Sequence, residues 1–220
     1  MVTILPRPAD TIRRPRQKRS QQRFEAILDS ADRLLETLEP EAISIYTLAE
    51  EAGLSAPSIY HFFRDAGQVF VALAERYARE FVDLLDRPLP HGVTTWQAFF
   101  AARYGNGRNH YNAHGAARRL LLGSGLSASI RARDLESDSV LAERSTAEFC
   151  QLFAIDPSAD LVERFTELLV INDAIWTLSV HRHGVITDAY EEQARRAREA
   201  YCLTFLPEHL PLRAAEEQAA

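Results

Sequence analysis

The chain has 220 residues, of which 46% are hydrophobic and 25% charged, with 9 glycines, 10 prolines and 2 cysteines. This composition is typical of a soluble globular protein and excludes disorder throughout, a collagen-like repeat and a disulfide scaffold. Cys150 and Cys202 lie far apart and form no CxxC pair, which excludes a cysteine-based zinc site. The sequence has no apolar run of membrane-spanning length and no secretory signal, so we expect a cytoplasmic protein without a membrane partner.

Charge is distributed unevenly along the chain, whose net charge is −6. Residues 1–23 carry a net charge of +6, whereas the remaining 197 residues hold 18 basic and 30 acidic side chains and carry −12. A basic segment on an acidic body is typical of a tail that binds a polyanion. We therefore predict that residues 1–19 form a flexible basic arm; the alternative is a solvated tail without a partner. The arm cations nearest to the first predicted helix are Arg16, Lys18 and Arg19.

Helical periodicity runs along the chain from about residue 20, without the alternation typical of strands. The first predicted helix begins at the cap residue Ser20 and ends near Glu39, before Pro40. Asp65 followed by Gln68 resembles a capping box that opens a longer helix. The helices predicted in this part are 20–39, 44–51, 55–63 and a fourth that starts after residue 65 and ends before residue 88.

Residues 44–63 have the pattern of a helix-turn-helix, in which the second helix enters the major groove of DNA. Gly53 stands where the chain must turn sharply and favours a positive φ. Ser55 is predicted to cap the second helix, and Pro57 falls in its first turn. An apolar helical hairpin inside a core would show a similar pattern, but the outward face of this second helix is small or polar. That face consists of Ala56, Ser58, Tyr60 and His61.

Prolines 88 and 90 mark the best domain boundary. Beyond them we predict five more helices, separated by glycines and one Asp-Pro pair. The fold class is therefore all-α with about nine helices: a three-helix DNA-binding type of domain over 20–86 with its fourth helix as connector, a second domain over 87–206, and a loose tail over 207–220. The later helices are predicted at 95–104, 108–122, 127–153, 157–181 and 187–205, with breaks at Gly105, Gly107, Gly123, Gly125, Pro157 and Gly184.

Residues 94–183 combine aromatic side chains with a few polar groups. A small-molecule pocket needs this mixture, although an aromatic stripe can also be plain core. Asn172 and Asp173 interrupt an apolar helix and must find partners or water; their alternative role is a structural pair or a dimer contact. The candidate ligand-binding residues are Trp96, Phe100, Arg103, Tyr104, His110, Tyr111, His114, Phe149, Asn172, Asp173 and Trp176.

Two histidines are the remaining candidates for chemistry. His110 and His114 share a helix face at i and i+4, as metal-binding pairs do, but no further ligand accompanies them. The sequence has no GxSxG, Walker or HExxH motif. We therefore predict no metal, no cofactor and no catalytic residue. An all-α enzyme that uses His110, His114 and Asp173 is an alternative.

The last two long helices, within residues 157–206, have wide apolar surfaces that favour a homodimer. The apolar residues on the first of these helices are Leu161, Phe165, Leu168, Leu169, Ile175, Trp176 and Leu178. Those on the second are Tyr190, Ala194, Ala197, Tyr201 and Phe205.

A family resemblance becomes specific between Arg23 and Leu73, RFEAILDSADRLL…ISIYTLAEEAGLSAPSIYHFFRDAGQVFVAL. This run resembles the DNA-binding domain of the TetR family of bacterial transcriptional regulators in its first helix, in the LAEEAGLS turn and in the SIYHFF recognition helix. The rest of the chain resembles the family only as an all-helical ligand-binding and dimerisation domain. Ala66 departs from the family, which often has a phosphate-binding lysine at this place, so one cation is missing.

The resemblance implies which residues contact DNA. The start of the first motif helix approaches phosphates or a base edge, the start of the recognition helix lies over the bases, and Tyr60 matches the usual phosphate-contacting tyrosine. Arg64 substitutes for the cation missing at Ala66, and the arm adds backbone or minor-groove contacts. The candidate DNA-binding residues are Ser44, Tyr46, Ser55, Ala56, Pro57, Ser58, Tyr60, His61 and Arg64, with Arg16, Lys18 and Arg19 of the arm.

Together these features predict a dimeric DNA-binding transcriptional regulator. We expect a repressor that binds a near-palindromic operator and is released by a small-molecule effector bound within residues 94–183. The alternative is a helix-turn-helix protein that is controlled by a protein partner or has no effector. A cavity smaller than roughly 300 Å³ would favour that alternative.

Overall fold

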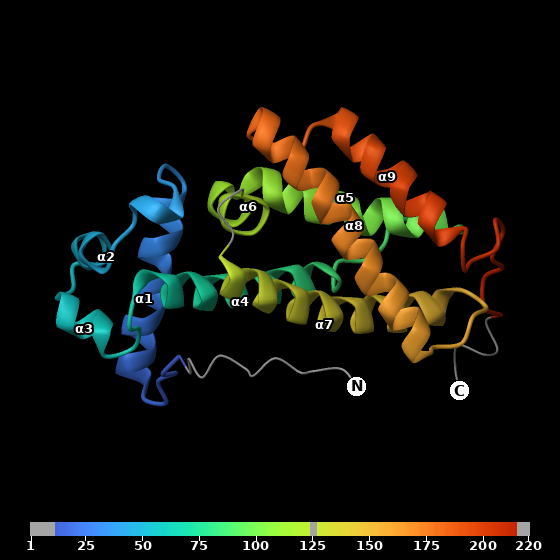
Figure 1. Ribbon diagram of the computed structural model, residues 1–220. Helices are drawn as coiled ribbons and strands as arrows, with labels where there is room; N and C mark the ends of the chain where they lie inside the picture. Colours follow the sequence, from blue (N-terminus) through green and yellow to red (C-terminus); the bar gives the residue numbers. More distant parts are fainter. Residues whose placement is uncertain (1–11, 124–126, 215–220) are drawn as a thin grey trace, which may run out of the picture.

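The computed structural model describes residues 12–123 and 127–214. This part of the chain folds into helices joined by short turns, and its only β pairing is an isolated bridge between Phe153 and Leu212. Figure 1 shows α1, α2 and α3 gathered at one end of the molecule, while α4 runs from them into the second part, beside α7. The predicted all-α fold with about nine helices is confirmed for the described residues.

The N-terminal helices form where the apolar periodicity placed them, but their ends differ. The first begins at Lys18, after the extended residue Gln17, and not after the predicted cap Ser20. It ends at Leu35 rather than near Glu39. Residues 18 and 19 thus belong to a helix and not to a flexible arm. The bounds are Lys18–Leu35 (α1), Pro40–Ala42 (a 3-10 turn, η1), Ile45–Ala52 (α2), Ala56–Tyr60 (α3) and Ala66–Leu84 (α4).

One apolar face of α1 holds the N-terminal helices together. Phe24, Ile27 and Leu28 are at most 4% exposed. The Phe24 ring lies 4.9 Å from the ring of Phe63, which follows α3. Burial of each such side chain contributes about 1.5–3 kcal/mol to folding. This packing holds α3 and the residues after it against α1.

The second part differs from the prediction at two glycines. The break expected at Gly105 and Gly107 is wrong, because α5 continues through both residues. A glycine inside a helix costs about 1 kcal/mol relative to alanine, a cost that buried aromatic neighbours on the same helix offset. The chain breaks instead at His114, whose φ is −119°, whereas the break expected at Gly184 is confirmed by its φ of +72°. The bounds are Trp96–Ala113 (α5), Gly115–Leu122 (α6), Ala128–Leu152 (α7), Ala159–His183 (α8) and Asp188–Cys202 (α9).

The segment after α9 is held against the end of α7 as far as residue 214. The Ala154 amide donates to the Pro211 carbonyl at 2.9 Å, and the Arg213 amide donates to the Leu152 carbonyl at 2.9 Å. The Arg213 guanidinium also donates to the Cys150 carbonyl at 2.8 Å. The predicted loose tail is therefore wrong for residues 207–214, because backbone pairing fixes them; the rest of it lies outside the described residues.

A single buried apolar cluster extends through both parts of the molecule. In the second part α7 and α8 pack on each other, α9 covers α8, and α4 lies along α7. The short helix α6 contacts α1, α4 and α8, so it joins the two parts. No helix in the described part of the chain is both long and apolar enough to cross a membrane.

Candidate functional site

The pair α2–α3 has the geometry of a helix-turn-helix. Ser44 caps α2, since its Oγ accepts the Thr47 amide at 3.1 Å. Gly53 follows α2 with a φ of +61°, in the left-handed region that glycine adopts without strain, as predicted. Ile59 is fully buried and anchors the inner face of α3. The opposite face of α3 is left to solvent at the end of the molecule (Figure 1).

The sequence-predicted DNA-contacting residues of the motif have accessible side chains. Tyr46 and Tyr60 are 70% and 49% exposed, although large aromatic side chains are usually more buried. Their phenolic hydroxyls can therefore reach a phosphate oxygen without rearrangement of the fold. Ser44, Ser55, Pro57, His61 and Arg64 are exposed, and Ala56 and Ser58 are partly exposed.

Two local expectations about capping are corrected. The Ser55 side chain makes no cap hydrogen bond, because its Oγ pairs with the Ser58 Oγ at 2.8 Å. Asp65 does cap α4 by accepting the Gln68 amide at 2.9 Å, but the Gln68 side chain accepts the Arg64 amide rather than completing a capping box. Pro57 falls in the first turn of α3 as predicted. The recognition helix ends at Tyr60 and not at residue 63.

The basic arm is divided between two environments. Arg16, Lys18 and Arg19 are exposed around the start of α1, where they can approach a DNA backbone. Arg14 instead donates to Glu75 of α4, a carboxylate that also pairs with Arg133 of α7. Residues 1–11 of the predicted arm lie outside the described residues.

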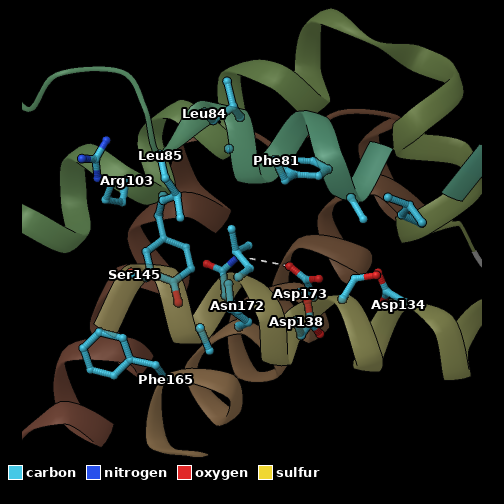
Figure 2. Close-up of a pocket in the computed structure, with 18 of the residues that line it drawn as sticks. Phe81, Leu84, Leu85, Arg103, Asp134, Asp138, Ser145, Phe165, Asn172 and Asp173 are labelled. Carbon is cyan, nitrogen blue, oxygen red and sulfur yellow. Dashed lines mark hydrogen bonds between the residues drawn. The ribbon is translucent and has the colours of Figure 1, made fainter. Parts of the chain in front are cut away.

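A cavity of about 100 Å³ lies between α4, α5, α7 and α8, closed at one side by Leu121 of α6. Figure 2 shows the polar groups of α7 and α8 facing the apolar residues of α4 across it. Its volume is below the roughly 300 Å³ expected of a site for a drug-sized molecule, which favours the alternative without such an effector. The sequence-predicted residues that line it are Phe100, Arg103, Tyr104, Tyr111, Asn172, Asp173 and Trp176.

Four other candidates lie outside this lining. The Trp96 indole donates to the Pro207 carbonyl at 3.0 Å, and Phe149 stacks behind Phe100 with ring centroids 5.6 Å apart. The rings of His110 and His114 lie 4.3 Å apart. The His110 Nε2 is 3.3 Å from a Glu80 carboxylate oxygen of α4, and His110 lowers the pKa of that carboxyl.

Sequence reasoning missed the two acids that α7 contributes to the cavity, Asp134 and Asp138. They lie four residues apart, in register with the apolar residues Ile130 and Ala142. That spacing puts all four on the buried face of one helix, and this was the available signal. Asp134 and Asp138 are 9% and 7% exposed, and Ile130 and Ala142 are 3% and 0% exposed.

The acids of α7 meet Asp173 of α8. Asp134, Asp138 and Asp173 each place a carboxylate oxygen within 4.8 Å of the other two. Desolvation raises the pKa of Asp138, and the charges of Asp173 and Asp134 raise it further. The pKa of Asp173 is raised mainly by burial and then by Asp134, while the Asn172 amide, which donates to it at 3.3 Å, lowers it. Burial and mutual repulsion therefore disfavour full ionisation of these three acids.

A buried arginine orders the wall beside these acids. Arg198 of α9 is 1% exposed and stands 4.1 Å above the Tyr104 ring. It donates to Asn172 and, at 2.8 Å, to Glu191, which also accepts the Trp176 indole N–H at 2.9 Å. Asn172 therefore has the satisfied structural partner that was one of its two expected roles, while it also lines the cavity.

The expected dimer surface is partly used within the chain. On α8 and α9 several of the apolar residues assigned to it are buried in the monomer, because these helices pack on each other and on α7. The buried ones are Leu161, Phe165, Leu168, Trp176, Tyr190 and Ala194. The ones that keep accessible surface are Leu169, Ile175, Leu178, Ala197, Tyr201 and Phe205.

Comparison with known proteins agrees with this architecture. Residues 27–73 match the family model described as bacterial regulatory proteins, tetR family. A TetR-family transcriptional regulator from Streptomyces coelicolor is 20% identical with a TM-score of 0.61, covering 86% of this chain and 99% of its own. A TetR regulator from Rhodococcus sp. RHA1 is 14% identical with a TM-score of 0.56, covering 88% and 100%. The flavonoid-responsive regulator FrrA is 19% identical with a TM-score of 0.51, covering 86% and 99%.

No curated protein matches the sequence significantly. The exposed helix α3 and the matched segment define a helix-turn-helix DNA-binding protein. Residues 27–73 thus match the DNA-binding segment of tetR-family regulatory proteins, and the chain shares the fold of solved TetR-family regulators.

Proposed function

We propose that the protein is a homodimeric repressor that leaves a near-palindromic operator when a small molecule occupies the cavity between α4, α5, α7 and α8. Residues 20–86 serve as the DNA-binding domain, with α4 as connector, and residues 87–206 serve as the effector-binding and dimerisation domain. The observation that carries the proposal is that the cavity is lined by α4 and α6, the helices that also hold α1.

The connection from the cavity to α1 runs through α6. Leu121 lines the cavity at one end of this helix. At the other end the carboxylate of Glu36, the residue that follows α1, accepts the Ala116 amide at 3.0 Å, where the helix dipole favours a negative charge. Arg119 adds a 3.0 Å bond to Glu39. A ligand that displaces Leu121 thereby moves a helix that is clamped to the DNA-binding domain.

The second connection runs along α4. Phe81, Leu84 and Leu85 near its end line the cavity. Further toward its start, Tyr77 donates to Asp32 of α1, and Arg76 donates to Asp29 of α1 at 2.6 Å. A shift of α4 at the cavity therefore changes the position of α1 and of the recognition helix packed on it. Such a ligand acts only through its different affinity for the two arrangements.

The small volume of the cavity supports a second candidate, a regulator that has no small-molecule effector. In that case the cavity is a packing defect and DNA binding is constitutive or depends on a protein partner. The two candidates differ in one measurement, the effect of small molecules on a protein–operator complex, because only the first candidate predicts release.

Selection of bound duplexes from a random pool tests the DNA-binding half of the proposal. A dimer should enrich two inverted half-sites whose centres lie about one helical turn, or a multiple of it, apart. Enrichment of no sequence at all would contradict the proposal. Deletion of residues 1–16 should make the slope of log K against log salt shallower by about 0.9 for each phosphate that the arm neutralises. An unchanged slope would mean that the arm is a solvated tail.

The dimer is tested by mass measurement in solution. Leu178 is 40% exposed and Ala197 is partly exposed. Leu178→Glu combined with Ala197→Glu should produce monomers and weaken operator binding, because two charges would be buried in the interface. Ala147→Glu, at an exposed position of α7, is the matched control. Monomeric wild-type protein at micromolar concentration would contradict the dimer.

A further inference from the structure

The cavity contains more acidic groups than its surroundings provide with partners. Of its three acids, Asp134 is paired with Arg131 at 3.0 Å. Asp173 accepts one bond, from the Asn172 amide. For Asp138, the Oδ2 atom is buried and has no hydrogen-bond partner in the described part of the chain. Buried carboxylate oxygens without donors are rare because each costs free energy, so this atom points to a donor that a ligand supplies.

The arginines around the cavity form hydrogen bonds and ion pairs with groups other than Asp138. Arg103 makes a paired contact with Glu148 and donates to the Arg87 carbonyl at 2.7 Å. Arg198 is held by Glu191 and Asn172. Neither guanidinium can turn to Asp138 without leaving a partly buried carboxylate unpaired, which is unfavourable. The two carboxylates Asp138 and Asp173 are thus left facing the cavity.

The rest of the lining is apolar and largely aromatic. Tyr104, Tyr111 and Trp176 are each at most 8% exposed and line the cavity together with Phe81 and Phe100. Aromatic faces attract a cation within about 6 Å of the ring. Figure 2 shows Phe81 and Leu84 on the side opposite the acids, so the cavity has an acidic wall and an apolar wall.

We propose that the cavity binds a small organic cation that carries N–H donors on an apolar body, namely a primary alkylammonium ion. The ammonium group would donate to Asp138 Oδ2 and to Asp173, and its chain would lie against Phe81, Tyr104 and Trp176. This inference names the effector class of the repressor proposed above and rests on that function for its role, although binding itself can be measured without DNA.

The lining favours an ammonium ion over a divalent metal ion. Three carboxylates within 4.8 Å could in principle ligate a metal, but Mg²⁺ keeps several of its waters and Ca²⁺ requires six to eight oxygens. The cavity supplies aromatic rings where those ligands would stand. An ammonium ion has three donors and can carry an apolar chain, which matches both walls.

The experiment is a titration of full-length protein with n-butylammonium, followed by Trp176 fluorescence and by calorimetry. The matched neutral probe is 1-butanol, which has the same number of heavy atoms, and tetramethylammonium has the charge without donors. Butylammonium should bind at least about 10-fold more tightly than either, because a hydrogen bond between charged groups is worth a tenfold factor or more. Binding should also tighten as the pH rises from 5 to 8, since burial and the neighbouring Asp134 raise the pKa values of Asp138 and Asp173, while Arg131 opposes this rise.

Asp138→Asn should weaken butylammonium binding at least about 10-fold, whereas Asp83→Asn at an exposed position of α4 should leave it unchanged. Equal binding of 1-butanol, an unaltered affinity in Asp138→Asn, or no binding of butylammonium would overturn the inference. Binding of Mn²⁺ in place of butylammonium would also overturn it. If Asp138→Asn does not fold, the comparison of the three probes on the wild-type protein still tests the inference.

Butylammonium binding without release of the operator would contradict the repressor mechanism but would still support the cation site.

Discussion

The two parts of the molecule bury different kinds of polar group. In the N-terminal helices the buried polar residues are Ser30, which donates to the Ala26 carbonyl at 2.8 Å, and Gln68, which completes the start of α4. Both are neutral and are satisfied by backbone within four residues. In the second part ionisable side chains are buried as well: Asp138, whose Oδ2 has no hydrogen-bond partner among the described residues, and Arg198, which donates to Asn172 of α8 and to Glu191 of its own helix.

The core of the N-terminal helices only has to be rigid, whereas the proposed function requires the core of the second part to bind a ligand. Neutral polar groups satisfied by nearby backbone fix a helix-turn-helix at little cost. Buried charges are expensive to desolvate and seldom improve stability over apolar packing. Their presence in the second part is consistent with a role in ligand recognition, and four experiments test this comparison.

The largest effect is expected at the buried arginine. Arg198→Met should lower the free energy of unfolding by about 3 kcal/mol, because the largely buried Glu191 would lose its ion-pair partner and Asn172 would lose a donor. The matched control is Arg196→Met on the same helix, whose side chain is 73% exposed and pairs with Glu192. That change should leave the free energy of unfolding nearly unchanged, because an exposed ion pair contributes little to stability. Urea unfolding followed by circular dichroism measures both, and similar costs would show that the buried network is not structural.

A smaller effect is expected at the turn of the helix-turn-helix. Gly53→Ala should cost about 1–2 kcal/mol, since a Cβ is strained at a φ of +61° although no neighbouring atom would contact it. Gly53→Asn should cost less, because asparagine tolerates the left-handed region. If the two variants unfold at the same urea concentration, backbone strain does not determine the stability of this turn.

The acidic cavity predicts a stability effect of opposite sign. The pKa of Asp138 is raised in the folded state, so the native protein binds more protons than the unfolded chain and loses stability as the pH rises above about 4. Asp138→Asn removes this penalty and should stabilise the protein at pH 8 by about 1.4 kcal/mol or more, the equivalent of one pKa unit. The gain should vanish near pH 4. Thermal unfolding across this pH range checks it, with Asp83→Asn as the exposed control; a pH-independent difference would refute the linkage.

The smallest effect is expected at the DNA surface. Tyr60→Phe removes one exposed hydroxyl and should weaken DNA binding by about 1 kcal/mol per site. Because phosphates carry no sequence information, specific and nonspecific duplexes should lose affinity alike. Tyr104→Phe, buried in the second part, serves as the control without a direct DNA contact. A loss confined to the selected operator would assign Tyr60 to base readout instead.

The helix-turn-helix was predictable from the sequence because its determinants are local. Gly53 and Pro57 act within one or two turns of their own backbone, and the apolar spacing of α1 sets which face it buries. The sequence-based predictions were wrong where contacts with distant parts of the chain determine the local structure. The helical turns after Gly105 continue because the surrounding aromatic core holds them, and the segment around Leu212 is fixed by pairing with residues near Phe153.

The sequence alone determined the all-α class and the DNA-binding motif, since helix periodicity and capping are properties of neighbouring residues. Only the tertiary structure decided the composition of the cavity. In the sequence Asp134 and Asp138 resemble ordinary acidic residues of a helix. The packing of α7 on α8 brings their carboxylates within 4.8 Å of Asp173. Arg198 likewise becomes a structural residue only when α9 covers α8. The physical reason is that burial and long-range electrostatics depend on which helix faces pack against each other. That packing joins residues far apart in the sequence, so local patterns do not predict it.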